Sequence, residues 1–238
     1  MIKEPAFVVA WNALLADPET AAACAETLAE GQREGGAMWG ERPLCVSLRP
    51  NLITKRQHSA NTAASEALYG ALGRLEHELL REEELRRELD LSPEEDRLAL
   101  ADPGFTAASP SSRLDGFVSD GVIRYVEYNA ESPAGMAYND VLVGIFERLP
   151  AMKAFRKRYR ARPLRAASKQ LTAMKRAHGR KVGTIAIVDW TGLPTLTEFQ
   201  MFQRAFTDSG VKTVICAPED LTYRGGRLRA KGTSSDVV

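Results

Sequence analysis

The tripeptide Ser119-Asp120-Gly121 is the feature that most constrains the local fold of this chain. It separates two runs with alternating apolar residues, 113–118 and 122–129. An Asp-Gly pair between such runs is a strong hairpin signal, because Gly adopts a positive φ without a steric penalty. The sequence therefore predicts an antiparallel β-hairpin over residues 113–129.

Side chains on the second run of this hairpin are expected to alternate between two faces. Strict alternation places Glu127 and Asn129 on one face with Ile123 and Tyr125, and it places Arg124 on the other. A carboxylate beside an amide carbonyl is a hard oxygen pair of the kind that Mg²⁺ binds. The alternative is that Glu127 and Asn129 belong to an ordinary solvent-exposed strand face.

Charged residues and a short loop lie close to Glu127 and Asn129 in the sequence. Arg113 and Asp115 are expected to share a face of the first strand, and a fixed cation beside a metal-binding pair suits phosphate chemistry. The small residues 130–135 allow backbone amides to approach a ligand closely. A helix predicted over 138–149 begins at this corner, so we expect its first turn to direct N–H groups toward the ligand.

Taken together, these motifs resemble a known group of ligases. Arg113-x-Asp115, a hairpin, and a strand ending in Glu127-x-Asn129 before a small-residue loop are similar to the corresponding stretch of the eukaryotic-type glutathione synthetases. The same stretch resembles the circularly permuted ATP-grasp ligases, which include the glutathionylspermidine synthetases. The resemblance implies that Glu127 and Asn129 bind Mg²⁺, that Arg113 is catalytic at the reacting phosphate, and that Asp115 supports it.

The resemblance also implies substrates and cofactors. Ser132 and Gly135, in the loop after the strand, would contact the substrate, and the cofactors would be Mg²⁺ and ATP. A complete enzyme of this family activates a carboxylate as an acyl phosphate and then joins it to an amine. The amino-acid sequence of the loop around Ser132 differs from the more serine-rich loop of the glutathione synthetases, so the acid and the amine are not identified.

The first hundred residues are predicted to be mostly helical. Asp17 and Pro18 begin a helix that ends at Gly35-Gly36, as expected for an N-cap, a first-turn proline and a C-terminal glycine. Residues 59–89 carry the longest amphipathic pattern. Its charged end, 81–90, is interpreted as a solvated helix end, and Ser92 begins a capping box.

The last sixty residues predict a different architecture. Residues 181–190 read as a buried strand, 194–209 as a helix and 211–216 as a second strand, which together form a βαβ unit with a parallel pair. The resemblance to the ligases further implies a hairpin at 223–228 and the start of another strand at 236–238. The first turn lacks the GxGxxG pattern, so NAD binding is rejected.

The predicted fold class is therefore α/β with an α+β front end. Residues 1–165 would form a helical region with the hairpin that carries the Glu-x-Asn site. Residues 166–238 would form a small, Rossmann-like domain. The resemblance implies that this is a pre-ATP-grasp domain and that the chain ends before the ATP-binding lobe.

Composition limits the function classes. A net charge of +1 argues against a dedicated nucleic-acid binder. The basic run 153–165 is interpreted as a solvated helix face, with RNA binding as the weaker alternative. There is no apolar run of about 20 residues and no signal-peptide pattern. Three scattered cysteines indicate reduced thiols, so we expect a cytoplasmic protein without a membrane partner.

The resemblance thus implies that this chain is the substrate- and magnesium-contributing N-terminal portion of an ATP-dependent carboxylate–amine ligase. Its partners would be a small-molecule or peptide carboxylate and an amine, and either a separate ATP-binding lobe or a second copy of the chain. The segment alone is expected to be inactive, because most nucleotide-binding residues of the family are missing from it. The alternative is a non-catalytic α/β ligand-binding or interaction domain derived from the same fold.

Overall fold

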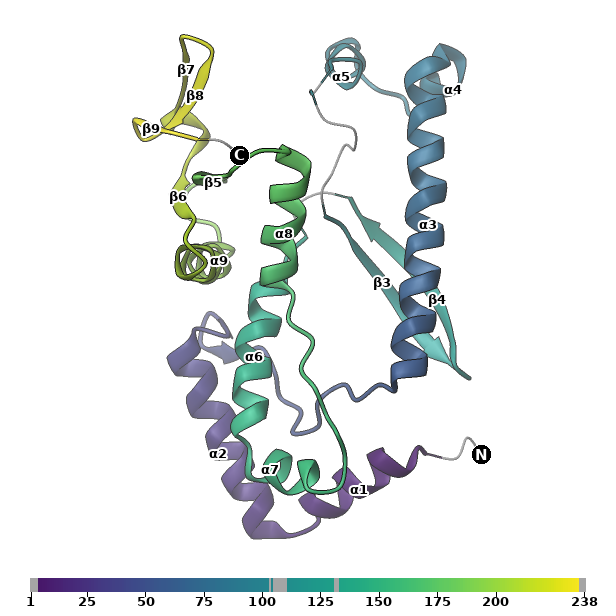
Figure 1. Ribbon diagram of the computed structural model, residues 1–238, viewed down its shortest axis with the longest axis vertical. Helices are drawn as coiled ribbons and strands as arrows, with labels where there is room; N and C mark the ends of the chain where they lie inside the picture. Colours follow the sequence, from purple (N-terminus) through teal and green to yellow (C-terminus); the bar gives the residue numbers. More distant parts are fainter. Residues whose placement is uncertain (1–3, 103, 105–110, 131–132, 236–238) are drawn as a thin grey trace. The chain divides into compact units, whose positions relative to one another are not determined.

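The structure is a computed structural model of the 238-residue chain, and it describes residues 4–102, 104, 111–130 and 133–235 (Figure 1). Its contacts gather into two compact units. The first joins Met1–Leu52 to Pro133–Val238, and the second is Ile53–Ser132. Helices and small sheets are mixed in the chain, so the broad α/β class is confirmed. The two units do not coincide with the boundary predicted between residues 165 and 166.

Helices dominate the first unit. They are α1 (Ala6–Leu15), α2 (Pro18–Gly35), α6 (Met136–Arg148), α7 (Pro150–Arg156), α8 (Ala167–His178) and α9 (Leu196–Asp208). Helix α2 begins and ends as predicted. The Asp17 carboxylate accepts the N–H of Thr20 at 2.9 Å, Pro18 occupies the first turn, and Gly36 closes the helix at φ 71°.

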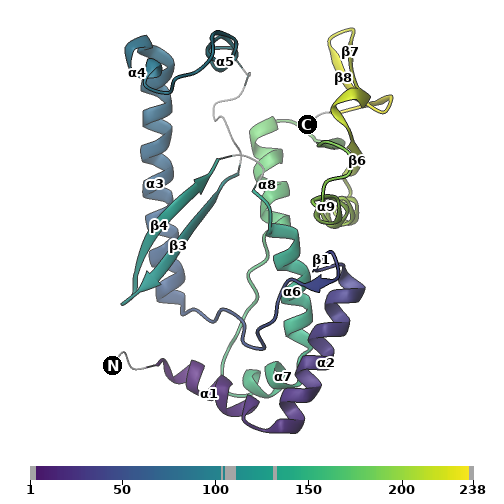
Figure 2. The ribbon, with the colours of Figure 1, turned by 180° about the vertical axis from the view of Figure 1, so that it is seen from behind.

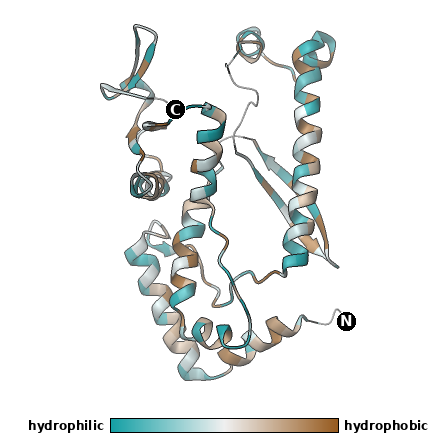
Figure 3. Ribbon diagram, viewed as in Figure 1, coloured by the Kyte–Doolittle hydropathy of each residue, from teal (hydrophilic) through white to brown (hydrophobic). Residues whose placement is uncertain are grey.

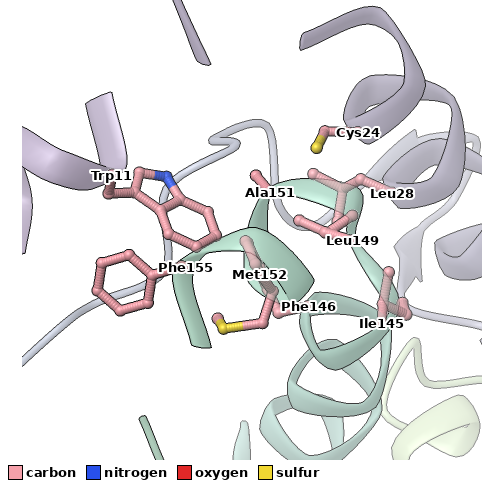
Figure 4. Close-up of a cluster of buried hydrophobic side chains, with 9 residues drawn as sticks. All are labelled: Trp11, Cys24, Leu28, Ile145, Phe146, Leu149, Ala151, Met152 and Phe155. Atoms are coloured by element: carbon pink, nitrogen blue, oxygen red, sulfur yellow. The ribbon is translucent and has the colours of Figure 1, made fainter. Parts of the chain in front are cut away.

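The main hydrophobic core of the first unit lies where α1, α2, α6 and α7 pack together (Figure 4). Its buried residues are Trp11, Cys24, Leu28, Ile145, Phe146, Leu149, Ala151, Met152 and Phe155. Trp11 and Phe155 meet edge to face with ring centroids 5.4 Å apart, an arrangement that aromatic pairs prefer. Helix α1, coloured as strongly hydrophobic in Figure 3, thus supplies an anchor for this core.

The predicted βαβ unit is present in the first unit. Strands β5 (Thr184–Val188) and β6 (Lys212–Cys216) are parallel and in register along their full length, and α9 connects them. A second core cluster forms beneath them from Leu171, Val182, Ile185, Phe206 and Val211. Parallel pairing with a helical connection confirms the strand–helix–strand prediction.

Short strands complete the first unit. They are β1 (Met38–Trp39) and β2 (Arg42–Pro43), which form a hairpin, and β7 (Leu221–Arg224), β8 (Arg227–Ala230) and β9 (Thr233–Ser234), which form an antiparallel sheet. The β7–β8 turn at Gly225-Gly226 confirms the hairpin predicted at 223–228. The strand predicted at 236–238 lies outside the described residues.

The described residues of the second unit form three helices and one hairpin. The helices are α3 (Lys55–Arg81), α4 (Glu83–Arg87) and α5 (Pro93–Ala99). The single helical pattern predicted for 59–89 is interrupted at Glu82, whose backbone is extended (φ −107°, ψ 103°). The capping box of Ser92 with Glu95 is confirmed.

One residue of the charged segment 81–90 is not solvated. The Arg86 side chain is buried, with Nε donating to Asp96 Oδ1 at 2.6 Å and Nη1 donating to the Leu79 carbonyl at 3.0 Å. The interpretation of this segment as a solvated helix end was therefore wrong for Arg86. Burial of the arginine is compatible with folding because its Nε and Nη1 donors have partners.

The predicted hairpin forms β3 (Arg113–Ser119) and β4 (Val122–Asn129), which run beside α3 in both ribbon views (Figures 1 and 2). Asp120 and Gly121 have φ values of 54° and 78°, as a two-residue turn with both φ positive requires. The hydroxyls of Ser65 on α3 and Tyr125 on β4 are 2.8 Å apart and share a hydrogen bond. The helix therefore covers the Tyr125 face of the hairpin.

The two units differ in how many of their apolar side chains are buried. All fully buried apolar residues of the described chain belong to the first unit, and Arg86 is the only described residue of the second unit that is as deeply buried. Two-stranded sheets are marginally stable alone and need packing on further strands or a helix. No helix of the described residues is long and apolar enough to cross a membrane.

Candidate functional site

Strand pairing in the hairpin brings four polar side chains to one face. Arg113 lies opposite Asn129, and Asp115 lies opposite Glu127. Residues directly opposite each other in an antiparallel pair project on the same side, and their Cβ atoms are about 5 Å apart. The candidate residues predicted on the two strands are therefore neighbours within the second unit.

A β-bulge determines which other residues share this face. The register shifts between Asp115 and Gly116, so Gly116 pairs with Tyr125 and leaves Val126 as an extra residue on β4. Gly116 and Tyr125 consequently occupy the opposite face, which α3 covers.

The face assignment made from strict alternation was therefore wrong in part. Ile123 and Tyr125 project away from Glu127 and Asn129 because the bulge reverses the alternation at Val126. Arg124, which pairs with Phe117, is on the same face as Glu127. Glu127 and Asn129 still share a face, since both lie on the same side of the bulge.

Arg113 and Asp115 form a close ion pair. Arg113 Nε donates to Asp115 Oδ1 at 2.7 Å and Nη2 donates to Oδ2 at 3.2 Å, a two-point geometry that fixes both side chains. The hydrogen bond from Arg113 is the main cause that lowers the pKa of Asp115 below its ordinary value. The arginine charge and a hydrogen bond with the carboxyl group of Glu127 act in the same direction, and partial burial opposes them.

Strand pairing places the carboxyl groups of Asp115 and Glu127 opposite each other. Two neighbouring carboxylates repel each other unless they share a proton or a cation. Arg113 offsets one of the two charges. A divalent cation placed at Glu127 would offset the other.

Asn129 contributes a partly buried amide beside this pair. Its Nδ2 atom is buried and has no hydrogen-bond partner among the residues that the structure describes. The two orientations of an amide side chain differ only in which atom is nitrogen and which is oxygen. A rotated amide would place its oxygen, a ligand for hard cations, at the position that lacks a partner.

This donor set fits Mg²⁺ as a partial site. Within the described ranges, no three His, Cys, Asp or Glu side chains gather closely enough to hold a metal ion by themselves. Mg²⁺ is commonly held by one or two carboxylates while it keeps water or substrate phosphate as its remaining ligands. Glu127 and Asn129 match that pattern, whereas both oxygens of Asp115 accept hydrogen bonds from Arg113.

Gly135 belongs to the first unit and has a different environment from the one expected. Its N–H donates to both carboxylate oxygens of Glu198, at 2.8 Å and 2.9 Å, and the N–H of Ala137 donates to Glu198 Oε1 at 3.0 Å. The expectation that the first turn of α6 offers its N–H groups to a ligand was therefore wrong for these two amides. Ser132, the other predicted substrate-binding residue, lies outside the described residues.

Glu198 was missed by the sequence analysis. It lies in α9, only 2% of its surface is exposed, and its contacts are more than sixty residues away in the chain. A glutamate in an amphipathic helix ordinarily indicates a solvated position, and nothing local distinguishes this one. Its role as an N-terminal cap for α6 is visible only in three dimensions.

The basic run 153–165 also differs from its interpretation. Helix α7 ends at Arg156, so most of the run does not form a helix face. Arg156 and Arg165 both donate to Glu147 on α6, at 2.9 Å and 2.7 Å. These two arginines connect parts of the first unit, which leaves fewer charges for binding RNA.

No family model and no curated protein matches the sequence of this chain. The resemblance to ATP-grasp ligases therefore stays a prediction from the motifs around Arg113 and Asn129.

Proposed function

We propose that this chain is the substrate- and magnesium-contributing part of an ATP-dependent carboxylate–amine ligase. The observation that carries the proposal is the β3–β4 register, which gathers Arg113, Asp115, Glu127 and Asn129 on one face. This set combines a fixed cation with hard oxygen ligands, which is the combination that phosphoryl transfer requires.

In the proposed reaction, a substrate carboxylate attacks the γ-phosphorus of ATP, and ADP leaves. An amine then attacks the acyl carbon of the acyl phosphate, loses a proton and displaces phosphate. Mg²⁺, when bound, supplies charge neutralisation at the transferring phosphoryl group. Glu127 and Asn129 would hold it.

Arg113 has the catalytic role in this proposal. Its guanidinium would stabilise the negative charge that develops on the phosphoryl oxygens, an effect that depends on a fixed position. The two hydrogen bonds to Asp115 provide that position. Asp115 therefore acts as a positioning residue.

The low burial of the second unit supports a further lobe. None of its described apolar residues is fully buried, and the outward side of the hairpin carries Phe117 with 71% of its surface exposed. A separate ATP-binding lobe seated on this unit would cover such surface and add the nucleotide contacts. Ser132 and Gly135 stay proposed substrate contacts, with the backbone N–H of Gly135 already engaged by Glu198.

The second candidate is a non-catalytic α/β ligand-binding domain. It is favoured by one observation: two cavities, of about 380 Å³ and about 200 Å³, are lined entirely by residues of the first unit and by none of the hairpin residues. A domain that binds a ligand there would not need Glu127.

Metal binding to the full chain distinguishes the two candidates. Mn²⁺, a paramagnetic substitute for Mg²⁺, should broaden the NMR signals of β3 and β4, and the broadening should strengthen when ATP is added. Glu127→Gln should weaken Mn²⁺ binding by at least about tenfold, as expected for loss of a carboxylate at a metal site.

The matched control is Glu66→Gln, which removes an exposed glutamate from α3 in the same unit and should leave Mn²⁺ binding unchanged. Equal Mn²⁺ affinity in the wild-type chain and in Glu127→Gln would contradict the ligase proposal. That result would leave the non-catalytic candidate in place.

A further inference from the structure

A cavity of about 200 Å³ lies at the carboxyl end of the parallel β5–β6 pair, in the first unit. In open α/β sheets, ligands bind outside the carboxyl ends of the strands, where the connecting loops leave a crevice. Its walls come from the loop after β5, the first turns of α9 and the segment after β6. None of the residues that line the cavity belongs to the hairpin.

The rim of the cavity is apolar and exposed. Trp190, Leu193 and Leu196 line it, and they are 64%, 40% and 46% exposed. Scattered single apolar residues on a surface are normal, whereas several that surround one hollow indicate a binding site. The remaining apolar wall is formed by Phe199, Ile215 and Ala217. The cavity therefore favours a ligand with an apolar body.

The cavity lining contains two aspartates and one lysine, and only one of the aspartates lies close to the lysine. Lys231 donates to the Ile215 carbonyl at 2.9 Å and lies 3.8 Å from Asp220, so these two charges largely offset each other. Asp189 has no ion-pair partner within the described part of the chain. Its carboxylate accepts one N–H from Trp190 at 2.8 Å and the hydroxyl of Thr195 at 3.3 Å.

Those two hydrogen bonds fix the Asp189 carboxylate without saturating it, because an ionised carboxylate accepts about four. The backbone of Asp189 is also held, since its N–H donates to the Cys216 carbonyl at 3.2 Å. Burial is the main cause that raises the pKa of the Cys216 thiol, so this thiol stays uncharged near neutral pH and adds no second anion.

We propose that this cavity binds a small primary amine with an apolar body, whose ammonium group pairs with Asp189. The site needs neither ATP nor the hairpin residues, so it stands apart from the ligase proposal. The volume is below the range of drug-sized pockets, which begins at about 300 Å³, so it accommodates a ligand of only a few carbon atoms or a single ring.

Direct binding to the full chain tests this inference with three probes that differ in charge: 2-phenylethylamine, 2-phenylethanol and 3-phenylpropanoate. Titration calorimetry, with amide NMR shifts at Thr191 and Gly192, should show amine binding with a Kd on the order of 1 mM. The alcohol should bind about two- to fivefold more weakly, as expected for loss of a partly exposed ion pair. The carboxylate should bind more weakly still.

Asp189→Asn should reduce the affinity for the amine to that for the alcohol, because the amide has no charge. The matched control is Glu219→Gln, which removes an exposed carboxylate outside the lining and should change neither affinity. Leu196→Lys provides a second variant: its ammonium at the rim should repel the amine while β5 and β6 stay folded.

Three results would overturn the assignment. They are equal affinity for the amine and the alcohol, unchanged amine affinity in a folded Asp189→Asn or Leu196→Lys chain, and no amine binding at about ten times the expected Kd. None of these outcomes bears on Mn²⁺ binding at Glu127.

Discussion

The carboxylate of Glu198 in α9 holds the backbone N–H of Gly135 at the start of α6, with its two oxygens 2.8 Å and 2.9 Å from the nitrogen. Gly135 has φ 104°, a conformation that favours glycine. A buried carboxylate is compatible with folding only where hydrogen bonds or charges compensate its lost hydration. The helix N-terminus supplies both, through its N–H groups and its dipole.

We expect Glu198→Gln to destabilise the first unit by about 1–3 kcal/mol, because the amide offers one acceptor oxygen and presents its NH₂ group to a backbone donor. Hydrogen exchange of the Gly135 and Ala137 amides should become faster, and the urea midpoint should fall. Glu219→Gln, an exposed control in the same unit, should change neither. Unchanged protection of both amides would show that Glu198 is not the cap.

The ion pair between Arg113 and Asp115 should make the stability of the hairpin depend on pH. Because Arg113 lowers the folded-state pKa of Asp115, the contribution of Asp115 to stability is present above its unfolded pKa of about 3.9 and is lost as the pH falls through the folded pKa. A ¹³C NMR titration of the Asp115 carboxyl should give a pKa below the ordinary value.

Arg113→Gln should raise that pKa of Asp115, since it removes both the hydrogen bond and the charge. Arg124→Gln is the matched control: Arg124 is on the same hairpin face but is not among the causes of the shift. An Asp115 pKa that moves equally in both variants would mean that general surface charge, and not this pair, is responsible.

Sequence reasoning succeeded where the signal was local. The cap at Asp17 and the turn at Asp120-Gly121 each depend on a few adjacent residues, and the βαβ pattern depends on three consecutive segments. The structure contains all three features. The bulge at Val126 could not be predicted, because β4 keeps its alternating pattern in sequence while the extra residue appears only when β4 pairs with β3.

The contacts of Glu198 were out of reach for a similar reason. They join two elements distant in sequence, and the side chain itself resembles any solvated glutamate in a helix. Asp189 had a usable signal that the sequence analysis did not apply: it directly follows a buried strand, at the end where ligands bind in parallel sheets. The roles proposed for Arg113, Glu127 and Asn129 stay predictions, although the register places these residues together.

The β-bulge requires a residue without a side chain at position 116. A Cβ atom at this position would lie 2.8 Å from the Arg124 carbonyl oxygen, which is backbone and cannot move aside easily. Gly116→Ala should therefore destabilise the hairpin by about 1–3 kcal/mol. It should also shift the NMR signals of Asp115 and Glu127, because the same bulge sets their face.

Gly73→Ala is the matched control in the second unit. Gly73 lies within α3, and a Cβ atom there meets nothing within 4 Å. Alanine should stabilise this helix by about 0.5–1 kcal/mol. If both alanine variants stabilise the unit equally, the close approach of the two strands at Gly116 does not occur.

The contrast in burial predicts a contrast in hydrogen exchange. Amides of β5 and β6 sit over a core that includes Ile185, Phe206 and Val211, so they should open only when much of the first unit unfolds. Amides of β3 and β4 should exchange faster, because the hairpin has two strands and no fully buried apolar residue among those described. Exchange NMR on the full chain measures both sets of amides in one sample.

The ligase proposal expects a separate ATP-binding lobe that covers the second unit. Addition of this lobe should selectively slow the hydrogen exchange of the β3 and β4 amides. Protection of β3 and β4 equal to that of β5 and β6 in the chain alone would show that the hairpin needs no such cover.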